Sequence, residues 1–81
     1  MFLCMVGRRF VTSRYLLGAH YDDAALVDTL PKARDFACSV FDSLIHGRVQ
    51  NALSEDRDAG VQVIEHYGFK DERVVATIGG A

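Results

Sequence analysis

The chain has no tryptophan, a single proline and only two cysteines among its 81 residues. Cys4 and Cys38 are too far apart for a redox CxxC motif or a zinc knuckle, and two cysteines are too few for a disulfide scaffold. The apolar run 2–6 is too short for a signal peptide, and nothing approaches the roughly 20 apolar residues of a membrane span. These shortages argue against disulfide-rich secreted and membrane classes, so we expect free thiols, a cytoplasmic location and no membrane partner.

Net charge is also small, at −2, which does not indicate a polyanion partner for the whole chain. The charge is unevenly placed, however. Residues 1–20 carry three arginines and no carboxylate, whereas residues 21–81 carry six basic and eleven acidic side chains. We interpret Arg8, Arg9 and Arg14 first as an electrostatic complement to the acidic remainder and second as a binding patch.

Apolar residues, in contrast, make up 49% of the chain. A chain of this length forms one domain (1–81) with one core, and it buries only about 60 to 65% of the surface that its unfolded form exposes. No repeat, low-complexity tract or linker divides it, and residues 79–81 are expected to form a flexible tail. The apolar surplus therefore predicts that some apolar side chains stay at the surface.

The clearest predicted element is an amphipathic helix at about residues 30–46. Its apolar residues recur at i, i+3, i+4 and i+7 spacing, as one face of a helix requires. They are Leu30, Ala33, Phe36, Ala37, Val40, Phe41, Leu44 and Ile45. Thr29 is placed to cap the N-terminus, and Pro31 suits the first turn. His46 and Gly47 supply a C-terminal cation and the glycine that commonly follows a helix.

Four further segments are rich in β-branched, aromatic and aliphatic residues and predict strands. They are residues 10–17, 24–28, 61–67 and 73–78, the last two forming a hairpin. Residues 1–8 are expected to add an edge strand or a loose N-terminal segment, 48–53 a short irregular or helical insert and 54–58 a solvated acidic loop. The predicted fold is an α+β two-layer sandwich of order ββα(short insert)ββ, with a mainly antiparallel four-stranded sheet and one principal helix. The second sheet face would be bare.

Few residues could carry chemistry. The turn 20–23 (His-Tyr-Asp-Asp), with His66 on a strand, matches no established metal-binding spacing, so we interpret it as a polar turn. The acidic loop before Gly60 fails as a calcium site, because its glycine and its last ligand are out of place. No serine lies in a nucleophile motif, and Cys38 is interpreted as a packing residue. The sequence thus predicts no catalytic residue, no metal site and no cofactor.

The remaining candidate surface is basic and aromatic. The residues that we expect to contact a partner are Arg8, Arg9, Arg14, Tyr15 and Tyr67. Basic and aromatic side chains together are also typical of nucleic-acid binding, since they contact the phosphate backbone and stack on bases. Alternation along a strand would place Arg8 and Arg14 on one face and Arg9 and Tyr15 on the other, which splits the cluster. A nucleic-acid-binding accessory protein is therefore an alternative, as is a small-molecule-binding subunit of an oligomer.

Two strands, a helix with Ala-Arg-Asp-Phe-Ala at 33–37 and a C-terminal hairpin resemble, in size and pattern, many small proteins of phages and mobile elements. Some of those proteins inhibit host machinery. The resemblance implies a stand-alone, non-enzymatic interaction protein that occupies a partner, such as an anti-defence inhibitor. Because exposed apolar patches usually mark interfaces, the bare sheet face predicts a homodimer or burial against another protein.

Overall fold

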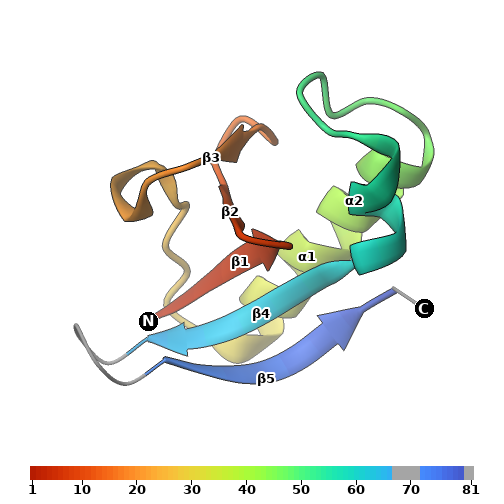
Figure 1. Cartoon of the computed structure of the whole chain (residues 1–81). Coiled ribbons are helices and arrows are strands. Elements are labelled where there is room, and N and C mark those ends of the chain that lie inside the picture. Colours follow the sequence, from red (N-terminus) through yellow and green to blue (C-terminus); the bar gives the residue numbers. More distant parts are fainter. Residues whose placement is uncertain (67–71, 80–81) are drawn as a thin grey trace.

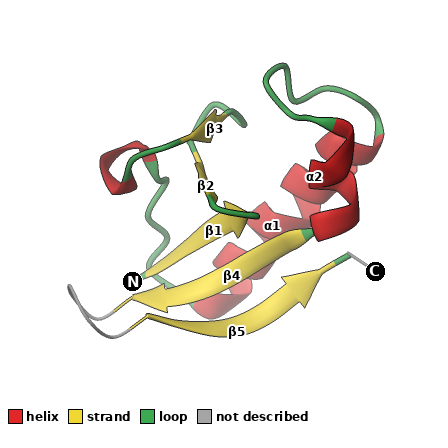
Figure 2. Cartoon of the chain, viewed as in Figure 1, coloured by secondary structure: helices red, strands yellow, loops and turns green. Residues whose placement is uncertain are grey.

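The computed structural model of the protein describes residues 1–66 and 72–79. One antiparallel sheet of five strands, in the order β3-β2-β1-β4-β5, carries the principal helix on one face (Figures 1 and 2). This is the expected α+β two-layer arrangement, with five strands instead of four. The elements in chain order are β1 (Phe2–Val6), β2 (Arg9–Val11), β3 (Leu17–Gly18), the 3₁₀ turn η1 (Tyr21–Asp23), α1 (Leu30–Ile45), α2 (Ser54–Ala59), β4 (Val61–His66) and β5 (Glu72–Ile78).

The helix α1 forms where the sequence predicts it. Thr29 caps it by accepting a hydrogen bond from the Lys32 amide at 3.4 Å, and Pro31 lies in its first turn. Gly47 follows the helix at φ +68°, a left-handed conformation that favours glycine. The residues buried against the sheet are Ala33, Ala37, Val40 and Leu44. Within the described ranges, no helix is both long and apolar enough to cross a membrane.

The strand β1 lies at the centre of the sheet, so the expectation of an edge strand or loose segment at 1–8 is wrong. It pairs with β2 on one side and with β4 on the other. Leu3, Cys4 and Val6 are all 0% exposed, because both faces of this strand are covered. A continuous apolar run is typical of such a strand, but five residues at a chain end do not reveal which neighbours they will find.

The long strand predicted at 10–17 is wrong, because the chain reverses direction within it. A turn separates β2 from β3, and in this turn the Thr12 hydroxyl accepts hydrogen bonds from the amides of Arg14 and Leu16, each at 3.2 Å. Such side-chain bonds compete with the ladder of a sheet. Tyr15 stands at φ +59° in the same turn, a conformation that no strand contains.

The strand predicted at 24–28 is reduced to a single bridge. Val27 exchanges two backbone hydrogen bonds of 2.8 Å with Phe2, at the start of β1. Just before it, the Ala25 amide donates to the Val11 carbonyl at 3.0 Å. This segment therefore runs past the end of β2 and pairs only where β2 has left the side of β1 free.

The second helix begins later than the sequence predicts. Of the two alternatives for residues 48–53, the structure shows the irregular one, and the acidic segment expected to be solvated forms α2 instead. Asp56 is only 7% exposed, and its carboxylate accepts a hydrogen bond from the Leu53 amide at 2.6 Å. Acidic residues in a first helical turn are favourable because they face the positive end of the helix dipole. The acidic side chains therefore start this helix.

The sheet face opposite α1 is covered in part, which corrects the expectation of a bare face. Leu3 and Ile64 are paired on that face and are 0% and 5% exposed. Tyr21 of η1 spans the face from β2 to β4, with its ring centroid 6.0 Å from that of Phe10 and 4.7 Å from that of His66. A loop side chain thus provides cover that a second helix would otherwise supply. Because the homodimer is predicted from a bare sheet face, this cover removes the main reason for predicting it. The oligomeric state stays a prediction.

The strands β4 and β5 form the predicted C-terminal hairpin, whose connecting residues lie outside the described ranges. The pairing skips Val75, because Val63 pairs with Ala76 and Ile64 pairs with Val74. Val75 is therefore the extra residue of a β-bulge, which bends the strand and increases its twist. β5 lies at the outer edge of the sheet, beside α1 (Figure 1).

Candidate interaction surface

Two of the five residues predicted to contact a partner have structural roles. The Arg9 guanidinium forms an ion pair with Asp56 and is 30% exposed. Tyr15 packs edge-on against Phe36 of α1, with ring centroids 5.4 Å apart. The interpretation of the arginines as a complement to the acidic part of the chain therefore holds for Arg9.

The other three residues do not form a common surface in the described part of the chain. Arg8 and Arg14 are exposed, but they lie in the turns before and after β2. Tyr67 lies outside the described residues, so the prediction for it is not addressed. Nothing described brings basic and aromatic side chains together into the platform on which bases stack.

A polar network closes the edge of the sheet at β3. The Asn51 side chain accepts from the Leu17 amide at 3.0 Å and donates to the Leu17 carbonyl at 2.7 Å, as a neighbouring strand would do. The Arg9 guanidinium donates to the backbone carbonyl of Asn51 at 3.1 Å and to the Asp56 carboxylate at 2.5 Å. The partners are 34 to 47 positions apart in the chain, so no local motif could have revealed them.

The turn 20–23 and His66 do come together, through an aromatic contact. The ring planes of Tyr21 and His66 are tilted by 36°. The His66 Nδ1 atom is buried and lies 3.4 Å from a Glu72 carboxylate oxygen, without the alignment of a hydrogen bond. Across residues 1–66 and 72–79, no three His, Cys, Asp or Glu side chains gather as a metal site requires. The cluster connects η1 to the end of β4 and covers part of the sheet face opposite α1.

The two thiols differ in environment. Cys4 is 0% exposed beneath α1, where burial raises the pKa of its thiol to about 12. A thiol with so high a pKa is a poor nucleophile, because the thiolate is the reactive form. Cys38 is exposed on α1, so its interpretation as a packing residue is wrong. Both cysteines are free.

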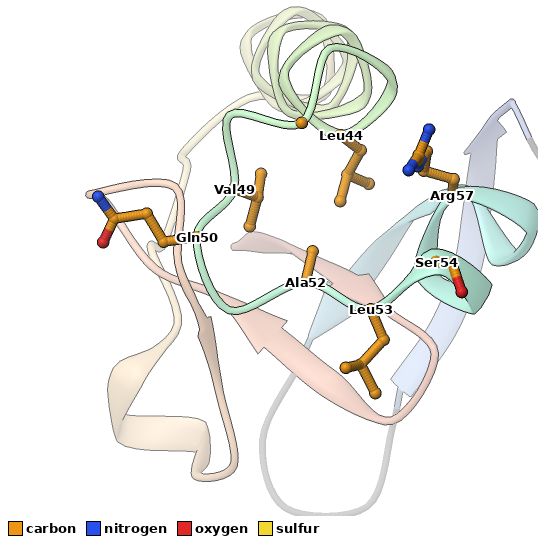
Figure 3. A pocket seen from close by; sticks show the side chains of 8 residues that line it. Leu44, Val49, Gln50, Ala52, Leu53, Ser54 and Arg57 are labelled. Atoms are coloured by element: carbon orange, nitrogen blue, oxygen red, sulfur yellow. The ribbon is translucent and has the colours of Figure 1, made fainter.

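A shallow hollow of about 190 Å³ lies between the end of α1 and α2 (Figure 3). Leu44, Val49 and Ala52 point into it, whereas Gln50 points away. The complete lining consists of Leu44, Gly47, Val49, Gln50, Ala52, Leu53, Ser54 and Arg57. This set holds one cation and no carboxylate, imidazole or thiol, so the lining itself provides no acid–base pair.

The second edge of the sheet, at β5, is open. The strand is seven residues long, and no described backbone or side-chain group hydrogen bonds to the side that faces away from β4. Val74 is 50% exposed on the sheet face opposite α1. Charge is confined to the first two residues, Glu72 and Arg73, and the rest of the strand is Val-Val-Ala-Thr-Ile. This edge therefore presents unpaired backbone beside uncharged side chains.

The flank of α1 next to β5 continues the open edge. The Phe41 ring lies against Gly79, so closely that a side chain at Gly79 would collide with it. Ile45 follows Phe41 after one helical turn and is 46% exposed, and Cys38 precedes it by one turn and is also exposed. We call the outer side of β5 together with Cys38, Phe41 and Ile45 the β5 edge surface.

Comparison of the chain with protein-family models, with curated proteins and with solved structures found no match.

Proposed function

We propose that the protein is a non-enzymatic interaction module that binds a partner protein through the β5 edge surface. The observation that carries this proposal is the open seven-residue edge of β5 beside the apolar flank of α1. Unpaired N–H and C=O groups along an edge strand are a template for another chain, and natural proteins usually cover or blunt such edges.

The side chains around this edge support the same function. Ile45 and Val74 are 46% and 50% exposed, on opposite faces of the edge. Exposed charged side chains accompany them, with Glu72 and Arg73 at the start of β5 and Arg34 one turn before Cys38 on α1. An apolar centre within a polar rim is the usual composition of a protein interface. An interaction protein of this kind would act by occupying its partner, and no chemical step is required of it.

A comparison of two equally exposed apolar residues tests the proposal. Ile45 lies on the β5 edge surface, whereas Leu26, at 47% exposed, lies in the loop on the β2 side of the sheet. We expect Ile45→Asp to abolish capture of a specific partner from a lysate of the cells that encode the protein. We expect Leu26→Asp to leave capture unchanged, since both variants replace an exposed side chain and should fold alike.

The controls separate location from function. Circular dichroism and thermal melts must show that both variants are as folded as the wild type. Loss of capture in Leu26→Asp with retention in Ile45→Asp would place the interface elsewhere. Equal capture by both variants and the wild type would contradict the proposed surface altogether.

A further inference from the structure

We infer that the occupant of the β5 edge surface is a single extended segment of the partner, which pairs with β5 as a sixth strand. This inference rests on the proposed function and adds the mode of binding and the chemistry of the bound segment. The segment alternates apolar and small polar side chains and carries a carboxylate at one end.

The backbone of β5 offers its free groups in a regular way. Phe2 directs both its N–H and its C=O to Val27. Along each strand, the N–H and C=O groups of successive residues point alternately to one neighbouring strand and to the other. Tracing this alternation from Phe2 through the β1–β4 and β4–β5 pairs directs the N–H and C=O of Ala76 and Ile78 toward β4. The N–H and C=O of Thr77 therefore point away from the sheet. A sixth strand would pair with them without displacing any bond in the protein.

The flank of α1 sets the side-chain pattern of the bound segment. In a strand placed beside β5, residues alternate between the two faces of the sheet. Those on the α1 side reach Phe41, which packs against the core, and Ile45, which is 46% exposed. Those on the other side lie beside Val74 and Thr77, where small polar or aliphatic side chains suffice. The pattern required is thus apolar at every second position.

Charge and length define the segment further. Arg34 is exposed on the same flank, one turn before Cys38, and pairs with no carboxylate in the described part of the chain. From Arg34 to Ile45 the helix rises by roughly 16 Å, which corresponds to about five residues of an extended strand. A carboxylate at the Arg34 end of a five-residue segment would therefore meet an available guanidinium.

A second copy of the chain fits this surface less well. Two copies paired through β5 in antiparallel fashion share a twofold axis normal to the sheet, so both α1 helices lie on the same face. Because α1 packs chiefly over β4, the two helix axes would be about three strand spacings, or roughly 14 Å, apart. Packed helices lie about 8 to 10 Å apart. The two helices would thus not pack on each other, and the only cover that a second copy brings to each flank is its own β5, so the rest of the copy adds no contact there.

The test uses a synthetic probe, the acetylated and amidated peptide Asp-Thr-Val-Thr-Val, in which the aspartate and both valines lie on the same face of the strand. Titration of the ¹⁵N-labelled full chain should give saturable amide shifts at residues 72–78 and at Phe41 and Ile45. Replacing the aspartate of the peptide by lysine should weaken binding several-fold. Methylating the peptide nitrogens on the pairing side should abolish it, a result that does not depend on the folding of any protein variant.

Protein variants provide the second arm. Thr77→Pro removes an N–H that points away from β4 and should weaken binding of the probe peptide at least tenfold, whereas the Leu26→Asp variant should bind the probe as the wild type does. Absence of saturable shifts, or shifts centred on η1 and the sheet face opposite α1, would overturn the inference. So would sedimentation showing a probe-free dimer that Thr77→Pro dissociates, since the occupant would then be a second copy. If the probe fails while partner capture still depends on Ile45, the strand mode falls and the proposed function stands.

Discussion

At one edge of the sheet, β3 has two residues and the Asn51 side chain binds both backbone groups of Leu17. At the other edge, β5 has seven residues and no comparable cover among the described residues. The first edge is short and closed by a side chain from a distant loop. The second is long, and within the described ranges only the charges of Glu72 and Arg73 and the bulge at Val75 discourage pairing with another chain.

The two edges differ in the polar side chains that lie beside them. Asn51, Arg9 and Asp56 form one connected network at the β3 edge, and each contacts at least one of the others. Buried or half-buried polar groups are costly unless all of them are paired, so such a network is worth keeping only where an edge must stay closed. At β5 the bulge limits flat stacking of many copies but leaves Thr77 available to one partner strand.

The largest expected effect on the free energy of unfolding comes from Cys4 in the central strand β1. The Cys4 thiol ionises near pH 9 in the unfolded chain but near pH 12 in the folded one. Between these values the unfolded state binds fewer protons, so stability falls as pH rises, by up to about 4 kcal/mol at pH 12. Urea unfolding from pH 8 to 11 should show a steeper loss in the wild type than in Cys4→Val.

Cys38→Ala is the matched control, because its thiol is exposed. This variant should follow the wild-type pH dependence. Amide exchange should also show that alkaline pH weakens β2 and β5 together, because β2 pairs with β1, β5 pairs with β4, and β1 and β4 pair with each other. A wild-type slope equal to that of Cys4→Val would mean that the Cys4 thiol is not buried in the folded chain.

Removing the carboxylate of the closed edge should have the next largest effect. Asp56→Ala leaves the Arg9 guanidinium and the Leu53 amide without their partner, and we expect a loss of about 1 to 3 kcal/mol. The value is below that of a fully buried pair because Arg9 is 30% exposed. Asp58→Ala, at an exposed position of the same helix, should change the free energy of unfolding by less than about 0.5 kcal/mol. Equal effects of the two variants in urea unfolding would rule out this role for Asp56.

A smaller change should open the closed edge itself. Asn51→Ala removes two hydrogen bonds to Leu17 and should cost about 1 to 2 kcal/mol. Hydrogen exchange should lose protection at the Leu17 amide while that of β4 stays high. Gln50→Ala is the control, since the Gln50 side chain points away from the loop (Figure 3). Unchanged exchange at Leu17 would show that Asn51 does not close this edge.

The smallest effect is expected at the open edge. Thr77→Pro removes an N–H that points away from β4, so we expect a cost of less than about 1 kcal/mol in thermal melts. Ala76→Pro, one residue earlier, removes a bond of the ladder with Val63 and should destabilise far more. If the two variants behaved alike, the orientation assigned to the β5 backbone would be wrong.

Elements with strong local patterns could be predicted from the sequence. The helix α1 has apolar periodicity, the Thr29 cap and the terminal Gly47, and the hairpin of β4 and β5 has alternating segments of sufficient length. The turn at Thr12 was missed, because a threonine hydroxyl that bonds to nearby amides looks in sequence like any strand residue. α2 was missed because an acidic segment is typical of both solvated loops and helix N-termini.

The candidate surface was harder to predict for a physical reason. Arg9 and Tyr15 are polar or aromatic, which are features of binding residues, but in the fold they contact Asp56 and Phe36. The β5 edge surface, in contrast, is defined by missing neighbours. Which strand lies at an edge depends on long-range pairing, and no residue type encodes it locally.

The central position of β1 also has a consequence for synthesis. β1 is made before β4, and Cys4 and Val63 are about 60 positions apart, so closure of a loop of that length precedes this contact. A ribosome-bound chain can form α1 before β4 is made, but β1 keeps one side unpaired until β4 has emerged. A nascent chain stalled before β4 should therefore expose the apolar run 2–6 to chaperones.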